Sequence, residues 1–166
     1  PDVIREIHTQ YLRAGADIIT TDTFNANAVS MADYGLEEYV YEMAREAARL
    51  ARGCADEFTL RNPSKPRFVA GSVGPTNKTA AMSADVDDPE ARGVDFDGLV
   101  AAYTSEIEGL VDGGANLLIL ETFFDTLNCK AAIFAAEQVF EQKGVRLPVI
   151  VSGTLTNSGR MLAGQS

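Results

Sequence analysis

Apolar residues recur along the chain in two alternating patterns, one typical of helices and the other of buried strands. Apolar positions three and four residues apart predict four amphipathic helices, at residues 2–14, after Gly35, from Phe96 to Leu110, and from Asp125 or Thr126 to Lys143. Short uninterrupted apolar runs predict buried strands, and these lie at 16–21, 67–72, 117–120 and 148–152. The chain therefore alternates helix and strand four times.

The helix after Gly35 has the clearest apolar stripe. Its members step by three and four residues, and they are Leu36, Val40, Met43, Ala47, Leu50 and Cys54. We expect this stripe to face the core, with Cys54 packed as an ordinary apolar side chain.

Strands that are apolar on both faces, alternating with helices that have one apolar face, are typical of a parallel sheet covered by helices. Such a sheet is either doubly wound or closed into an eight-stranded barrel. The glycine-rich phosphate loop of doubly wound proteins follows none of the predicted strands, and the nearest string, GSVG at 71–74, lacks its spacing. The stretch GADIITTDTF from Gly15 returns as GANLLILETF from Gly114. This repeat favours the barrel, in which every βα unit is equivalent.

Each predicted strand ends in polar residues. Asp22 and Thr23 follow the first strand, and Glu121 and Thr122 follow the third. The other two strands end in Gly-Pro-Thr-Asn at 74–77 and in Ser-Gly-Thr at 152–154. Barrel enzymes keep their active sites at this edge, although Asp, Ser and Thr also cap the helices that follow strands. Glu is a poor cap, so we interpret Glu121 as a functional acid.

Composition and charge narrow the function. The 166 residues carry a net charge of −10, which argues against binding to nucleic acid or to an anionic membrane. No apolar run is long enough to span a bilayer, and no secretory leader is visible. The two cysteines provide no disulfide framework, so a cytoplasmic location is expected.

Other candidate chemistry is interpreted as structural. The long connection from Thr76 to Asp95 is expected to be a lid or binding loop. Its acids Asp85, Asp87 and Asp88 do not match an EF-hand, because Glu90 stands where that loop needs glycine. We therefore expect this run of acids to lie in a solvated part of the loop and to bind no calcium. His8, which has no second histidine to pair with, and Cys129 are expected to be packing residues.

Six motifs resemble the homocysteine-binding domain of cobalamin-dependent methionine synthase. They extend in order over essentially all 166 residues, and they are GADIITTDTFNAN, MADYGLEE, FVAGSVGPTNKTA, FDGLVAAY, GGANLLILETFFDTLNCKAA and VSGTLTNSGRMLAGQ. The resemblance implies a (βα)8 TIM barrel that binds homocysteine and zinc. The zinc-activated thiolate then takes a methyl group from methylcobalamin, which methyltetrahydrofolate recharges on another module.

The resemblance also implies site residues. Glu121 matches the acid at a strand end that receives the homocysteine amino group. Rim positions around the same pocket match Asp22, Thr23, Asn25, Thr76, Asn77, Ser152 and Gly153.

The chain departs from this family at both ends of the barrel. The family's zinc cysteines, in Gly-Leu-Asn-Cys and Gly-Gly-Cys-Cys-Gly segments, and its first strand are missing. We therefore expect residues 1–166 to form part of a single domain, about four βα units resembling strands two to five and truncated at both ends. No catalytic residue or metal ligand is expected in it. Its partners would be homocysteine, the remaining barrel strands, and the folate and cobalamin modules.

Two alternatives stay open. The first is a cobalamin-independent thiol methyltransferase of the same superfamily, with betaine or S-methylmethionine as donor. The second is a catalytically inactive half barrel that serves as a binding module. A half barrel exposes two sheet edges and an apolar interior, so the isolated chain is expected to be inactive and to aggregate or pair.

Overall fold

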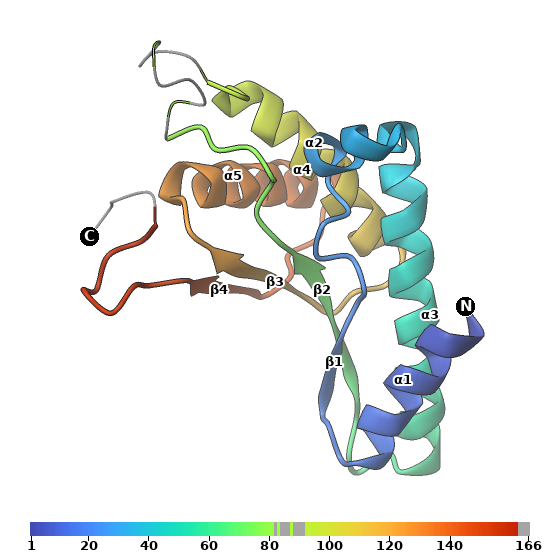
Figure 1. Cartoon of the computed structure of the whole chain (residues 1–166). Helices are drawn as coiled ribbons and strands as arrows, with labels where there is room; N and C mark the ends of the chain where they lie inside the picture. The colour runs from blue at the N-terminus through green and yellow to red at the C-terminus, as the bar shows by residue number, and fades with distance from the viewer. Residues whose placement is uncertain (82, 84–86, 88–91, 163–166) are drawn as a thin grey trace.

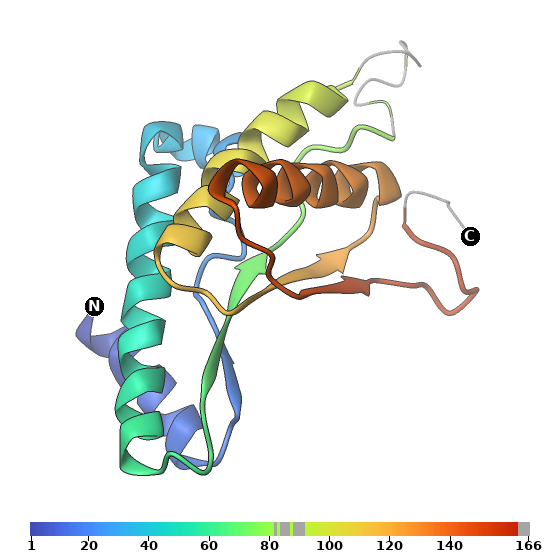
Figure 2. The same cartoon turned by 180° about the vertical axis from the view of Figure 1, so that it is seen from behind.

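The computed structural model describes residues 1–81, 83, 87 and 92–162, which contain one parallel sheet with helices on one face (Figures 1 and 2). The elements are α1 (Asp2–Arg13), β1 (Ile18–Thr20), α2 (Ala28–Met31), the 3-10 turns η1 (Ala32–Tyr34) and η2 (Glu37–Tyr39), α3 (Val40–Arg61), β2 (Phe68–Val73), α4 (Phe96–Asp112), β3 (Leu117–Phe123), α5 (Thr126–Lys143) and β4 (Val149–Gly153).

The four strands are hydrogen-bonded in chain order, β1-β2-β3-β4, and every pairing is parallel. Each connection contains a helix, the usual form of the crossover that a parallel pairing requires. The sheet turns strongly from β1 to β4 in Figure 1, and α1 and the segment after β4 lie on opposite sides of the molecule. This open, curved run of consecutive βα units confirms the expected partial barrel.

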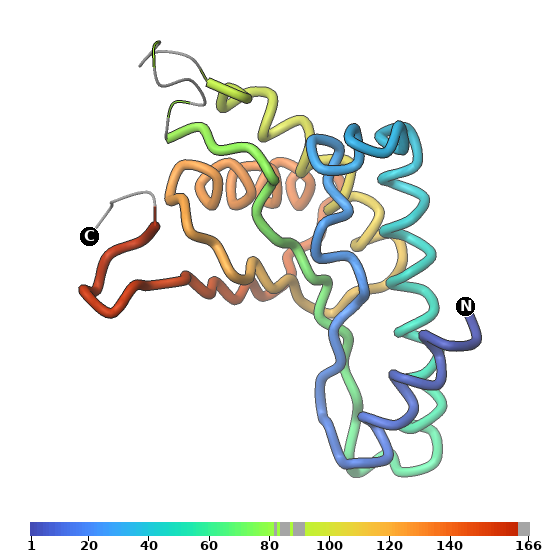
Figure 3. The backbone as a smooth tube through the Cα atoms, in the orientation of Figure 1, coloured from blue at the N-terminus to red at the C-terminus, as the bar shows by residue number. Residues whose placement is uncertain are grey.

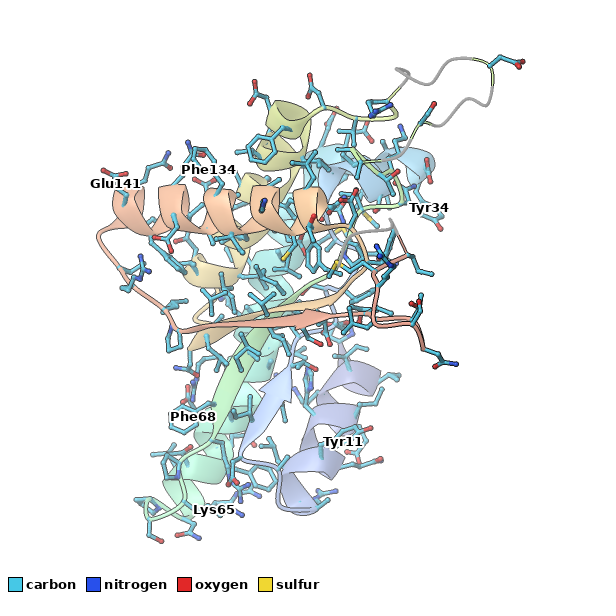
Figure 4. The ribbon with its side chains drawn as sticks, turned by 90° about the vertical axis from the view of Figure 1, so that its left-hand side faces the viewer. Tyr11, Tyr34, Lys65, Phe68, Phe134 and Glu141 are labelled. Atoms are coloured by element: carbon cyan, nitrogen blue, oxygen red, sulfur yellow. The ribbon has the colours of Figure 1, made fainter. Side chains whose placement is uncertain are left out.

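The two faces of the sheet have different surroundings. Side chains that alternate along the strands, such as Val69 and Leu118, are fully buried against the helices. On the other face, Ile18, Phe68 and Ile150 are 47%, 41% and 44% exposed. Figure 4 shows Phe68 on the part of the sheet away from α5. In a closed barrel this second face would be the interior.

Helix α3 buries only part of the predicted stripe, because Val40 and Cys54 are buried but the rest of its buried face is shifted. Met43 is 39% exposed, and the fully buried positions are mostly alanines, namely Ala44, Ala48, Ala51 and Ala55. The reason is the close approach of α4, where a Cβ at Gly109 would lie 2.4 Å from the carbonyl oxygen of Tyr41. Small residues on both helices let the backbones approach, and larger apolar side chains are displaced to the flank. Cys54, on the α1 side of this helix, is buried as predicted.

The predicted helix boundaries at α4 and α5 are confirmed by their caps. The side chain of Asp95 accepts a hydrogen bond from the amide of Gly98 at 2.7 Å, and Asp125 accepts one from the amide of Leu127 at 2.8 Å. Both bonds satisfy amides that the first turn of a helix leaves free.

Three features differ from the sequence prediction. The short helix α2 and the turns η1 and η2 occupy residues between the first strand and α3, so that α3 begins at Val40 rather than directly after Gly35. Strand β1 is shorter than predicted, and β3 continues to Phe123. The acids Asp85 and Asp88 lie outside the described residues, while Asp87 is exposed. Among the described residues, no helix combines the length and apolar character of a membrane span.

Candidate functional site

Polar side chains gather where the parallel strands end. Ser72 stands two residues after Ala70, the partner of Thr20 in the ladder, and Asp22 stands two residues after Thr20. Glu121 and Ser152 likewise stand two residues after the paired Ile119 and Ile150. Alternate residues of a strand share a face, so this polar edge tops the face that would be the barrel interior.

The structure brings Glu121 together with Ser72, a residue that the sequence analysis did not select. The Ser72 hydroxyl donates to Glu121 Oε1 at 2.6 Å, across the β2–β3 pairing. Ser72 is 2% exposed, whereas Glu121 remains partly accessible. The signal that could have revealed Ser72 was a polar residue in the otherwise apolar run FVAGSV, on the interior side of the strand.

A β-bulge shapes the backbone at Glu121. Between Leu120 and Phe123, strand β3 has one residue more than β4 has between the partners of these residues, Val151 and Gly153. Thr122 has φ of +65°, the only positive φ outside glycine among the described residues. A left-handed conformation is costly for a β-branched residue. Bulges re-aim side chains beside functional sites, and this one includes Glu121.

A hollow of about 400 Å³ opens beside this bulge. The segments that follow β1 and β2 run side by side above the sheet (Figure 3), where the amide of Gly74 donates to the carbonyl of Phe24 at 2.9 Å. Polar residues of the hollow include three predicted site residues, Asn25, Thr76 and Asn77. Aromatic side chains also line it, and they are Phe24, Tyr34 and Phe124.

Asn77 is tied to the segment after β1. Its Nδ2 donates to Asp33 Oδ2 at 2.5 Å, and its backbone amide donates to the Ser30 hydroxyl at 3.3 Å. The two loops that carry Asn25 and Asn77 are therefore joined into one wall of the hollow. Tyr34, which is 74% exposed, stands at the outer edge of that wall (Figure 4).

Thr76, which also lines the hollow, is 1% exposed and takes part in a hydrogen-bond network. Its amide donates to the Tyr103 hydroxyl oxygen at 3.1 Å, and its own hydroxyl accepts from Asn128 Nδ2 at 2.8 Å. Tyr103 Oη is also hydrogen-bonded to Asn128 Oδ1. Burial, and secondarily the nearby Glu106, raises the pKa of Tyr103, so this hydroxyl stays protonated. The network fixes the loop after β2 to α4 and α5.

The other predicted rim residues differ from one another in burial and in contacts. Thr23 is 3% exposed and its hydroxyl donates to the carbonyl of Ser72 at 2.6 Å. Ser152 and Gly153 are exposed on β4. Asp22 is exposed and lines grooves beside α1 with His8 and Ile4. Site roles for these residues stay predictions.

His8 and the cysteines pack as expected. His8 is 6% exposed, and burial lowers its pKa despite the opposing charge of Asp22. Burial raises the pKa of both Cys54 and Cys129. Each thiol lies in an apolar cluster and is therefore held in its protonated form.

The described residues do not fit a zinc site. Within them no three His, Cys, Asp or Glu side chains come close enough together to hold a metal ion. Zinc is bound by thiolates, neutral imidazoles or carboxylates, in structural sites as a tetrahedral set, and the two thiols lie in separate clusters with raised pKa values. We assign no step of chemistry to a metal held by these residues.

The strained bulge gives a stability prediction. We expect Thr122→Gly to raise the free energy of unfolding by about 1 kcal/mol, because glycine adopts positive φ without a Cβ clash. Chemical denaturation of the two proteins measures the difference. Thr20→Gly is the matched control, since it removes the same side chain from a strand residue with negative φ, and it should lower stability. Equal losses for both variants would contradict the assignment of strain to Thr122.

An open run of parallel βα units, with an acid on a bulge at its carboxyl edge, defines the chain as part of a (βα)8-barrel protein of the kind whose site lies at the strand ends. The model of the homocysteine S-methyltransferase family matches residues 1–166, and the chain belongs to this family.

Solved structures of the homocysteine methyltransferase MmuM from Escherichia coli are similar to the chain. The metallated form is 27% identical with a TM-score of 0.77, covering 99% of this chain and 56% of that chain. The oxidized form is 27% identical with a TM-score of 0.74, covering 99% and 55%. The apo form is 26% identical with a TM-score of 0.69, covering 99% and 54%. The chain thus spans about half the length of these proteins.

Proposed function

We propose that the chain supplies the amino-acid-binding part of a barrel that transfers a methyl group to the thiol of homocysteine, giving methionine. The observation that carries the proposal is the Glu121 carboxylate, set on a bulge at the strand ends and hydrogen-bonded to Ser72. In the reaction a bond forms between the methyl carbon and sulfur, the bond from the methyl carbon to its donor breaks, and the thiol proton leaves.

All of the predicted site residues except Asp22 have a proposed place in this function. Glu121 receives the α-ammonium group of homocysteine, because a carboxylate binds a cation by a charge-assisted hydrogen bond. Asn25 and Asn77 offer amide groups from the hollow, and Ser152 and Gly153 offer β4 as a further wall of the pocket. Thr23 and Thr76 hold the strand end and loop behind these groups.

The proposed methyl donor is methylcobalamin, recharged by methyltetrahydrofolate on another module. The support is the resemblance carried by GPTNKTA and FFDTLN. Zinc, as the activator of the homocysteine thiol, would be held by parts of the domain outside this chain. The proposal includes those parts, together with the folate and cobalamin modules, as partners, and it takes residues 1–166 as one piece of a single barrel domain in the cytoplasm.

One observation favours the second candidate, a sulfonium or quaternary ammonium donor such as S-methylmethionine or betaine. Three aromatic side chains and the carboxylate of Asp33 line the hollow beside the bulge. Aromatic faces attract such onium cations, and a carboxylate adds charge. The same hollow could therefore hold a cationic methyl donor.

The test uses a completed barrel, which we define as residues 1–166 joined in one reading frame to the remaining strands of the E. coli homocysteine methyltransferase. Methionine formation from homocysteine is measured with methylcobalamin, S-methylmethionine and betaine, next to the unaltered E. coli protein. The proposal expects a gain in the use of methylcobalamin over the E. coli protein. An unchanged donor preference would favour the onium donor. Homocysteine binding without methionine formation would favour the binding module, and a folded barrel that does not bind homocysteine would contradict the proposal.

A further inference from the structure

Ser72 has a side-chain role that is separate from its place in the strand. Its hydroxyl carries one proton, and that proton is donated to Glu121 Oε1 at 2.6 Å. The side chain is almost fully buried, so water does not compete freely for this bond. One carboxylate oxygen of Glu121 is thus fixed, and Oε2 is left for another donor.

The backbone of Ser72 is held by a ring of threonine hydroxyls. The Ser72 amide donates to Thr21 Oγ1 at 2.9 Å, and Thr23 Oγ1 donates to the Ser72 carbonyl at 2.6 Å. The two threonine oxygens lie 2.7 Å apart. Because Thr23 already uses its only proton on the carbonyl, Thr21 must donate to Thr23. Every proton in the ring has one acceptor, so the peptide groups of Ser72 are fixed from both sides.

The ring holds Ser72 in a fixed position, from which its hydroxyl can anchor the carboxylate of Glu121. Glu121 itself stands on the bulge with the strained Thr122, where β3 no longer follows the regular ladder. A flexible glutamate on an irregular strand end has several rotamers to choose from. The hydroxyl of Ser72 selects the Glu121 rotamer in which Oε1 accepts its hydrogen bond from β2.

We propose that Ser72 is a positioning residue that orients the carboxylate of Glu121 to receive the α-ammonium group of an amino-acid substrate. This inference rests on the proposed function, in which Glu121 binds that group. Ser72 acts through Glu121, and its hydroxyl itself makes no contact with the substrate.

A substitution at Ser72 separates positioning from structural support. Ser72→Ala removes only the hydroxyl, because the bonds to Thr21 and Thr23 use the backbone amide and carbonyl. The fold should therefore be retained. Ser72→Thr keeps a hydroxyl and is the conservative variant, and Ser105→Ala on α4 is the matched control for loss of a serine hydroxyl away from the site.

The first measurement is binding by the completed barrel, with homocysteine and with 4-mercaptobutyrate, which lacks the ammonium group. Ser72→Ala should weaken homocysteine binding about 10-fold, the size of one charge-assisted hydrogen bond, and leave 4-mercaptobutyrate binding unchanged. Ser72→Thr should restore most of the loss. In a Glu121→Gln background, Ser72→Ala should cause no further loss.

The outcomes distinguish the two proposals. If the unsubstituted barrel binds both ligands equally, the assignment of Glu121 to the ammonium group is wrong, and the proposed function loses its main support. If it discriminates but Ser72→Ala weakens both ligands equally, or neither, only the positioning role is overturned.

A second measurement needs no substrate. In the completed barrel without ligand, NMR couplings of the Glu121 side chain should report one rotamer, and averaging between rotamers should appear in Ser72→Ala. A single unchanged rotamer in Ser72→Ala would overturn the inference even if the substituted barrel bound ligands poorly.

Discussion

Glu121→Gln is expected to weaken homocysteine binding by the completed barrel about 100-fold, because the substitution removes the charge that pairs with the α-ammonium group while keeping the shape of the side chain. The fold should be unaffected, since Glu121 is partly accessible and Gln can still accept the Ser72 hydroxyl proton through its own oxygen. Isothermal titration with homocysteine measures the loss.

Two comparisons make this result specific. Binding of 4-mercaptobutyrate should change little in Glu121→Gln, because that ligand has no ammonium group. Glu141→Gln, on the face of α5 that points away from the sheet (Figure 4), should leave homocysteine binding as it is. Homocysteine binding of normal strength in Glu121→Gln would show that another residue receives the amino group.

Glu106→Leu is expected to stabilise the protein by about 1–3 kcal/mol at pH 7, the cost of leaving a buried polar group without a partner. Glu106 is 0% exposed in the middle of α4, and neither carboxylate oxygen has a hydrogen-bond partner among the described residues. Burial raises the pKa of this carboxyl well above its ordinary value. Between the pKa of the unfolded chain and the higher pKa of the folded protein, the native Glu106 carboxyl therefore keeps its proton while the unfolded one loses it.

The pH dependence of this effect has a definite sign. Below the ordinary glutamate pKa of 4.5, both states hold the proton and ionisation does not oppose folding. As the pH rises from there toward the folded-state pKa, the unfolded chain ionises first, so the free energy of unfolding falls. The advantage of Glu106→Leu should accordingly grow with pH over this window.

Urea denaturation of the full chain at a series of pH values measures this dependence. Glu106→Gln should lose the same pH dependence while keeping a polar group in place, and exposed Glu141→Gln should keep it. A loss of stability in Glu106→Leu at every pH would mean that the native carboxyl has a stabilising partner, and the assignment of an unpaired buried acid would be wrong.

Local sequence signals predicted the framework of the fold. The apolar runs located four parallel strands, and Asp95 and Asp125 were readable as caps because an N-cap depends on residues within one helical turn. The acid at the end of β3 was visible for the same reason, since it directly follows a buried run.

The features that were missed depend on contacts between distant segments. The buried face of α3 follows from Gly109 on α4, so its own apolar spacing was misleading and Met43 was wrongly placed in the core. Ser72 matters because β3 lies beside β2, a pairing that brings residues 49 positions apart into contact. The positive φ of Thr122 has no signal in a threonine, a residue that normally avoids this conformation.

The bulge at Glu121 and Thr122 also separates the two copies of the repeated stretch. Both copies write an acid, a threonine and a phenylalanine, yet Thr23 is 3% exposed with negative φ, whereas Thr122 is exposed with φ of +65°. Two segments with similar sequences thus differ in backbone conformation and in burial. If the two units descend from one ancestral βα unit, their divergence at this point lies in the backbone as well as in the exchange of Asp22 for Glu121. Exchanging the two acids between the copies would therefore not exchange their roles.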